Sequence, residues 1–159
     1  MVDLKYSERY NMDIQAKIDN SIRDFIKACK LANYQISLLD IEANYLQAPH
    51  SPSKLPKGRM AVYIFIYESE ILKIGLVGPK SNARYSSQHY NPNSSQSNLA
   101  KSILKDSKFA DNINEDNINS WMKTNLTRVN ILISEDKGMP MLRFLEAFLH
   151  LIFNPRYER

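Results

Sequence analysis

The sequence predicts an α/β (α+β) protein with a small, mostly antiparallel, three-stranded sheet flanked by helices. Two short runs rich in β-branched and aromatic residues, Ala61–Tyr67 and Ile71–Gly78, are separated by a polar triplet, which is typical of a β-hairpin. A third run, Arg128–Ser134, alternates apolar and polar residues as a strand does. Apolar residues at helical spacing before and after these runs predict the flanking helices.

The part of the chain before the hairpin is expected to be helical. Apolar spacing predicts an amphipathic helix over Met12–Tyr34 and a shorter helix around Leu38–Leu46. Three prolines follow in Gln47–Gly58, which we interpret as a linker. We therefore divide the chain into a helical extension with its Pro-rich linker, residues 1–56, and a core, residues 57–159. The extension could bind DNA, mediate dimerisation or cap the sheet, and we favour the cap.

The core is expected to contain four more helices after the hairpin. Capping residues, prolines and apolar spacing mark them. In chain order they are a helix from Ser81 or Asn82 to before Pro92, a helix from about Gln96 to Lys108, a helix over Asn114–Lys123 and a last helix over Met141–Phe153.

The register of the hairpin decides which side chains share a face. With Glu68–Glu70 as a three-residue turn, the pairs are Tyr67 with Ile71, Phe65 with Lys73 and Tyr63 with Gly75. Tyr63 and Lys73 then lie diagonally on one face, roughly 7–8 Å apart. A two-residue turn would shift the register by one and place them on opposite faces. We predict the three-residue turn.

Composition limits the class of protein without naming a function. The 159 residues are 43% hydrophobic and 24% charged, as in a soluble globular protein. The chain has no run of 18 apolar residues and no signal-peptide core, so we expect no membrane association. Cys29 is the only cysteine, which excludes an intrachain disulfide and favours the cytoplasm. The net charge of +4 permits a polyanionic partner and does not establish one.

Four short features in order resemble the core of the GIY-YIG nuclease superfamily. They are Ala61-Val62-Tyr63 in the first strand, Lys73-Ile74-Gly75 in the second, Arg84 in the next helix and Glu146 in a later helix. The resemblance runs from Lys57 to the end of the chain. Ala61 replaces the first glycine of the family pattern, and Lys73 replaces its second tyrosine. The lysine is similar to the type II restriction endonuclease branch of the family.

The resemblance implies an endonuclease that hydrolyses DNA phosphodiester bonds with Mg²⁺, for which Mn²⁺ can substitute. Tyr63 would activate or position the attacking water, Lys73 would support that step, Arg84 would neutralise the scissile phosphate and Glu146 would hold the cation. Without a large appended domain, a restriction endonuclease cutting a short double-stranded site is expected, as a homodimer if the site is symmetric. The alternatives are a repair or structure-specific nuclease and an inactive nucleic-acid-binding module of the same fold. A structural protein without a nucleic-acid partner is a weaker third.

The last helix carries the candidate metal ligand. Nine of the twelve residues in Leu142–Phe153 are apolar, so this helix should be largely buried. Arg143, Glu146 and His150 share its polar face. Arg143 and Glu146 could form an ordinary ion pair, but the resemblance favours Glu146 as the ligand of one Mg²⁺ that keeps several waters. For His150 we favour a hydrogen bond within the core, and Asn154 is equally well explained as the residue that ends the helix.

The remaining candidates lie on the hairpin and the helix after it. Arg84 could be an ordinary exposed arginine, but its guanidinium matches phosphate oxygens, and a helix N-terminus would favour an anion there. Gln88 and His89 could both contact the phosphate, and we prefer His89 because histidine exchanges protons near neutral pH. Tyr63 could be simple sheet packing, and becomes a base only if a cation lowers its pKa from about 10. Lys73 supplies that cation unless it faces solvent on an edge strand.

Three lysines could contact the DNA backbone. Lys101, Lys105 and Lys108 fall at positions i, i+4 and i+7 of the helix predicted from Gln96. That spacing places them on one helical face. The common alternative for such a stripe is a solvated surface.

Overall fold

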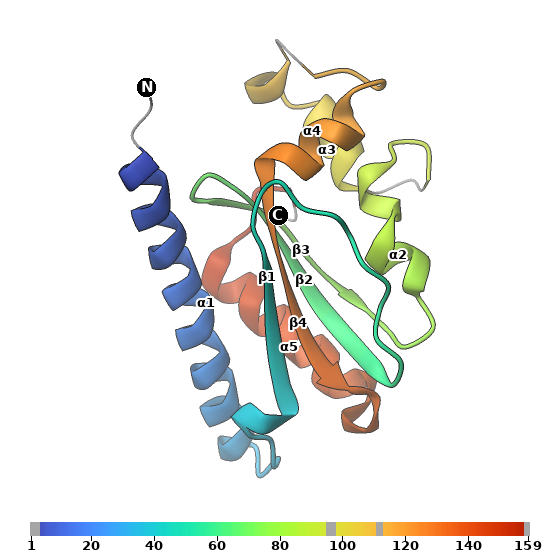
Figure 1. The fold of residues 1–159 in the computed structure, drawn as a ribbon. Helices are drawn as coiled ribbons and strands as arrows, with labels where there is room; N and C mark the ends of the chain where they lie inside the picture. The colour runs from blue at the N-terminus through green and yellow to red at the C-terminus, as the bar shows by residue number, and fades with distance from the viewer. Residues whose placement is uncertain (1–3, 95–97, 111–112, 158–159) are drawn as a thin grey trace.

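The computed structural model describes residues 4–94, 98–110 and 113–157 and contains one four-stranded sheet (Figure 1). The strands are β1 (Ile41–Leu46), β2 (Arg59–Tyr67), β3 (Glu70–Val77) and β4 (Leu126–Ser134). They lie in the order β1-β4-β2-β3, and every neighbouring pair is antiparallel. The predicted class, a small antiparallel sheet with flanking helices, is confirmed, but the sheet has four strands instead of three.

The additional strand is β1, where a short helix was predicted. Only Leu38–Asp40 is helical there, as a 3₁₀ turn, and Ile41–Leu46 pairs with β4 along its whole length. Ile41, Ala43 and Tyr45 alternate along β1 and pack against the core. An alternation with a period of two is typical of a strand, so the helix predicted around Leu38–Leu46 is wrong for Ile41–Leu46. Residues from the predicted extension, 1–56, therefore complete the sheet.

Two long helices, α1 (Leu4–Leu31) and α5 (Gly138–Phe153), cover one face of the sheet. In Figure 1, α5 crosses behind the strands and α1 runs beside it. The ring of Phe25 in α1 lies 5.2 Å from that of Phe144 in α5, measured between centroids. Both helices were predicted, and α1 packs as a cap. No helix in the described part of the chain is long and apolar enough to cross a membrane.

Short helices cover the opposite face. They are α2 (Asn82–Ser86), α3 (Leu99–Leu104) and α4 (Ile118–Asn125), with 3₁₀ turns at η2 (Gln88–Tyr90) and η3 (Ser107–Phe109). The helix predicted to reach Lys108 ends at Leu104, and its predicted start at Gln96 lies outside the described residues. Lys108 is on η3, so the three lysines do not form one helical stripe.

The Pro-rich segment between β1 and β2 packs on this second face. Its His50 is buried, and the backbone N–H of His50 donates to the carbonyl of Lys123 at 2.9 Å. Further along, the N–H of Leu55 donates to Asn82 Oδ1 at 2.9 Å. The segment therefore forms hydrogen bonds to both α2 and α4 and packs as part of the structure, where we had interpreted it as a linker.

Candidate active site

The β2–β3 hairpin has the predicted pairing at Phe65 and Tyr63, but its turn differs from the predicted one. Its turn has two residues, Glu68 and Ser69, where three were predicted. The observed pairs are Tyr67 with Glu70, Ile66 with Ile71, Phe65 with Lys73 and Tyr63 with Gly75. Leu72 is skipped as a β-bulge, and this extra residue restores the shift that a two-residue turn introduces. The predicted partner of Tyr67 is wrong, whereas the shared face of Tyr63 and Lys73 is confirmed.

Two rows of residues cross the three strands β4, β2 and β3. One row is Arg128, Phe65 and Lys73, and the next is Asn130, Tyr63 and Gly75. Their neighbours Val129, Ile64 and Ile74 belong to the core under α1 and α5, so both rows face the short helices. The sheet thus places two cations, Arg128 and Lys73, on either side of Phe65.

Gly75 is required by the position of the Tyr63 ring. A Cβ built on Gly75 would overlap the phenolic oxygen and stand 2.5 Å from Cζ of Tyr63. Real Cβ atoms do not approach so closely, so any side chain at position 75 would displace the ring. Gly75 therefore leaves open the space that the ring of Tyr63 occupies.

Lys73 is buried, with 4% of its surface exposed, and Tyr63 is completely buried. The solvent-facing alternative for Lys73 is therefore wrong, although β3 is an edge strand. A buried ammonium is costly unless charged or polar groups compensate it. The burial of Lys73 therefore places its ammonium on the face of the sheet that carries Tyr63 and Phe65.

His89, on η2, lies directly over this pair. Its ring is 4.5 Å from that of Tyr63 and 5.6 Å from that of Phe65, and only 2% of its surface is exposed. Neither ring nitrogen has a hydrogen-bond partner among the residues that the structure describes. Burial lowers the pKa of His89 to about 3, and the charges of Lys73, Arg84 and Arg128 add to the effect. The imidazole is therefore neutral at physiological pH.

This result changes the interpretation of His89. We preferred it because histidine titrates near neutrality, and that reason is wrong here. Its position against Tyr63 still suits the site, because buried polar groups without a partner are rare and costly. The two ring nitrogens of His89 are therefore available to a hydrogen-bond partner outside the described residues.

Arg84 and Gln88 lie on the same segment as His89. Arg84 is exposed on α2, and its charge acts on the His89 ring. α2 has only five residues, so its N-terminus adds little to anion binding, contrary to our expectation. Gln88 is half-buried at the start of η2. The charge of Arg84 thus reaches His89, and for both Arg84 and Gln88 the phosphate contact stays a prediction.

Glu146 lies on α5, a helix that contacts β3 and covers the face of the sheet opposite Tyr63. One turn later, His150 Nε2 donates to the carbonyl of Ile74 at 3.3 Å. At the start of the helix, Met139 packs near Gly78 at the end of β3. Glu146 stands between these two contacts and is half-buried. The predicted core hydrogen bond of His150 is confirmed, and Asn154 ends the helix in a left-handed conformation with φ 43°.

A magnesium ion at this site would have few protein ligands. In the described ranges, no group of three or more His, Cys, Asp or Glu side chains could form a protein cage for a metal. Mg²⁺ at phosphoryl-transfer sites commonly uses one or two carboxylates, several waters and phosphate oxygens. The half-buried carboxylate of Glu146 fits that type of site.

The three lysines have different environments. Lys108 Nζ pairs with Glu70 at 2.7 Å and lies over the rings of Tyr67 and Phe109. Lys105 is exposed and Lys101 is half-buried. Lys108 therefore pairs with an acidic side chain of the protein, and for Lys101 and Lys105 the DNA contact stays a prediction.

Sequence reasoning missed Arg128, His50 and Tyr90, which form a buried polar network beneath η2. Arg128 donates to Tyr90 Oη at 3.2 Å, and Tyr90 Oη lies 2.7 Å from His50 Nε2. The alternation of side chains along β4 could have indicated the position of Arg128. Val129 faces the core under α5, so its neighbour Arg128 must face the side of the sheet that carries Tyr63. A charged residue on the inner face of a central strand marks a buried polar site.

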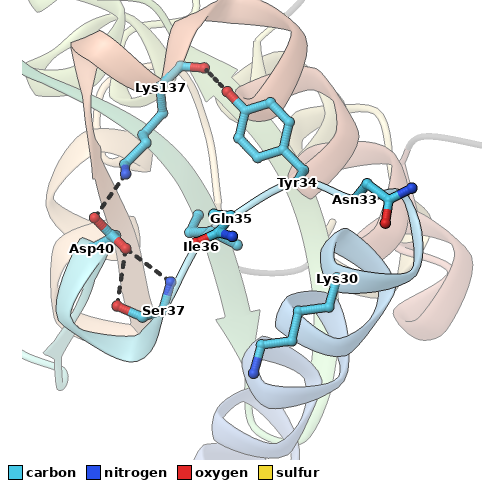
Figure 2. Close-up of a pocket in the computed structure, with 8 residues that line it drawn as sticks. All are labelled: Lys30, Asn33, Tyr34, Gln35, Ile36, Ser37, Asp40 and Lys137. Atoms are coloured by element: carbon cyan, nitrogen blue, oxygen red, sulfur yellow. Dashed lines mark hydrogen bonds and ion pairs between the residues drawn. The ribbon is translucent and has the colours of Figure 1, made fainter.

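A hollow of about 750 Å³ lies elsewhere, between the end of α1 and the start of α5 (Figure 2). Its polar groups bond to one another: Lys137 Nζ pairs with Asp40 at 2.9 Å, and Tyr34 Oη donates to the Lys137 carbonyl at 3.1 Å. None of the candidate residues lines it. The hollow is therefore separate from the candidate site on the sheet.

Comparison of the chain with models of known protein families, with curated proteins and with solved structures found no match. The chemistry that the candidate site could support must therefore be inferred from its residues. A phenol, a buried ammonium, guanidinium groups and a neutral imidazole gather on one face of the sheet, whereas the carboxylate of Glu146 belongs to α5, which covers the other face. Groups of these types are the ones that proteins use to bind anions and to transfer protons.

Proposed function

We propose that this chain is a metal-dependent endonuclease that hydrolyses DNA phosphodiester bonds, most simply as a type II restriction endonuclease. One observation carries the proposal: the charges of Lys73, Arg84 and Arg128 converge on His89, whose ring packs on buried Tyr63. Positive side chains around a histidine whose ring nitrogens have no hydrogen-bond partner among the described residues would suit an anionic substrate. A phosphodiester supplies that charge together with oxygens that accept hydrogen bonds.

Tyr63 and Lys73 are the pair that acts on the attacking water. They share a face because Phe65 opposes Lys73 and Tyr63 opposes Gly75. The phenolic oxygen would position the water or accept its proton, and the Lys73 ammonium would stabilise negative charge on that oxygen. The restriction-endonuclease branch is favoured within the class because lysine stands where the common family pattern has tyrosine.

Arg84 and His89 are assigned to the phosphate. The guanidinium of Arg84 would bind the scissile phosphate oxygens, for which its planar fork is suited. A neutral His89 ring would donate one N–H to a phosphate oxygen, which would satisfy a nitrogen that now has no partner among the described residues. Both groups would therefore stabilise charge instead of exchanging protons at neutral pH.

Glu146 would hold Mg²⁺, with Mn²⁺ as a substitute. When bound, the cation would supply Lewis-acid stabilisation of the charge that develops on the phosphate. We assign this role to Glu146 because it is a half-buried acidic residue on α5, the helix that contacts β3, and β3 carries Lys73. The chain would act in the cytoplasm, where its DNA substrate is found.

The direct test is incubation of supercoiled plasmid with the full chain, with Mg²⁺ or with a chelator. Discrete Mg²⁺-dependent fragments would support a restriction endonuclease, and end mapping would show whether the site is symmetric, as a homodimer requires. A smear, or cleavage only of branched DNA, would support a nonspecific or repair nuclease instead. Intact plasmid with a gel shift would indicate a binding module, and intact plasmid without a shift would contradict any nucleic-acid function.

A further inference from the structure

Arg128 is buried in the middle of the protein, with 1% of its surface exposed. Its guanidinium donates three hydrogen bonds: to Asn130 Oδ1 at 2.8 Å, to the Tyr85 carbonyl at 2.6 Å and to Tyr90 Oη at 3.2 Å. Across the described ranges, none of its observed partners is a carboxylate. Burial of an arginine without an acid is costly, so the position needs an explanation beyond packing.

Aromatic rings compensate part of that cost. The guanidinium carbon lies 4.8 Å from the ring centroid of Tyr85, 5.2 Å from Phe65, 5.8 Å from Tyr63 and 5.9 Å from Tyr90. A cation over aromatic faces is stabilised by their quadrupoles, more so when it is desolvated. These rings belong to β2 on one side and to residues 85–90 on the other. Arg128 therefore stands between the sheet and the segment that covers it.

The hydrogen bonds beyond Arg128 have fixed directions. His50 Nδ1 lies 2.8 Å from the Leu126 carbonyl, and because a carbonyl only accepts, Nδ1 carries the hydrogen. His50 Nε2 must then accept from the Tyr90 hydroxyl, 2.7 Å away. The Tyr90 oxygen is left to accept from Arg128, as observed. Burial lowers the pKa of His50, which agrees with a neutral ring.

We propose that Arg128 is a positioning residue of the candidate site. It fastens both ends of the segment Tyr85–Tyr90, through the Tyr85 carbonyl and the Tyr90 hydroxyl. It thereby holds His89 against Tyr63 and keeps Arg84, the residue before this segment, where its charge acts on His89. The catalytic part of this inference rests on the proposed nuclease function, whereas the fastening does not. A lysine cannot replace Arg128, because one ammonium cannot reach acceptors that a planar fork bonds on several sides.

Hydrogen exchange of the full chain tests the fastening without any substrate. In Arg128→Lys we expect the amides of residues 82–91 to exchange at least about tenfold faster, while those of α1 and β2 stay within about twofold of the unmodified chain. Arg23→Gln, a change at an exposed arginine on α1, is the matched control and should alter neither region. Unchanged exchange at 82–91, or an equal increase throughout the chain, would overturn the proposal.

Tyr90→Phe serves if Arg128→Lys fails to fold. It keeps the ring but removes the hydroxyl that links Arg128 to His50, so the same segment should loosen, and no loosening would overturn the proposal. In DNA cleavage, kcat of either folded variant should fall about 10²-fold with KM within about threefold, because a misplaced group costs rate more than binding. Unchanged kcat in a loosened variant would refute the positioning role. An inactive unmodified chain would refute the nuclease function and leave the exchange result decisive for the fastening.

Discussion

The phenol ring of Tyr63 lies directly over the backbone of Gly75 on the neighbouring strand, in the space where a side chain would stand. The two residues are cross-strand partners, and their contact sets how far the Tyr63 hydroxyl projects across β3. The same register places Lys73 two residues away on the same face. The lack of a side chain at Gly75 therefore allows the phenol of Tyr63 to take its observed position.

Gly75→Ala should displace Tyr63 and reduce DNA cleavage about 10²-fold, because the added Cβ overlaps the phenolic oxygen. Overpacking should also destabilise the chain by about 1–3 kcal/mol. Gly78→Ala is the matched control, since its Cβ would meet only the flexible side chain of Met139, at 3.4 Å. Single-turnover cleavage rates and urea unfolding measure both effects. Equal activity of the two variants would refute the steric role of Gly75.

Lys73→Met should reduce the cleavage rate about 10²-fold or more, the usual scale for a positioned acid–base group. Methionine fills a similar buried volume, so the loss should come from the ammonium. If Lys73 and Tyr63 act as a pair, the double variant with Tyr63→Phe should be scarcely slower than either single one. Lys73→Tyr, which restores the commoner family pattern, should recover part of the rate. A Lys73→Met protein that cuts at the normal rate would exclude the pairing.

Lys101 and Lys105 should contribute to the salt dependence of DNA binding, and Lys108 should not. Each phosphate contact adds roughly 0.9 to the slope of log K against log salt on duplex DNA. Lys108 is expected to add little because Glu70 already holds its ammonium at 2.7 Å. Binding titrations of Lys101→Ala/Lys105→Ala and of Lys108→Ala over a range of salt measure the slopes. A larger loss of slope in the Lys108 variant would reverse this assignment.

The buried neutral His89 predicts how stability depends on pH. Its pKa falls from 6.5 to about 3 on folding, so between these values the unfolded chain binds a proton that the folded chain does not. Stability therefore decreases as the pH falls from about 6.5 toward 3, by up to about 1.4 kcal/mol per pH unit. His89→Leu removes the effect, so between pH 7 and pH 5 it should lose about 2 kcal/mol less than the unmodified chain. Urea unfolding at both pH values tests this, and parallel losses would contradict it.

Most elements of the fold could be predicted from apolar periodicity. The hairpin strands, β4, α1 and α5 each carry a long apolar pattern with a clear period. β1 has only six residues, which are too few to distinguish the period of a strand from that of a short helix. The hairpin turn was predicted with the wrong length because a β-bulge has no periodic signal. The bulge at Leu72 nevertheless gave the predicted pairing of Phe65 with Lys73.

The candidate site was predictable only where it coincides with short motifs. Tyr63 and Lys73 follow from the register, but the burial of His89 depends on η2 folding back over β2, which no local pattern indicates. Arg128 was missed because an arginine at the start of a strand usually faces solvent. Its burial depends on partners at positions 85, 90 and 130, which only the tertiary structure assembles.

The central claim is that this chain hydrolyses DNA with a cation held by Glu146, and Glu146→Gln tests it most directly. The measurement is the single-turnover cleavage rate of plasmid in Mg²⁺, beside a gel shift of the same DNA without the metal. Glu115→Gln, at an exposed glutamate, is the matched control. The account predicts that Glu146→Gln binds DNA normally and cuts at least about 10³-fold more slowly, because the amide carries no charge for the cation. Cleavage by Glu146→Gln at the rate of the unmodified chain would contradict it.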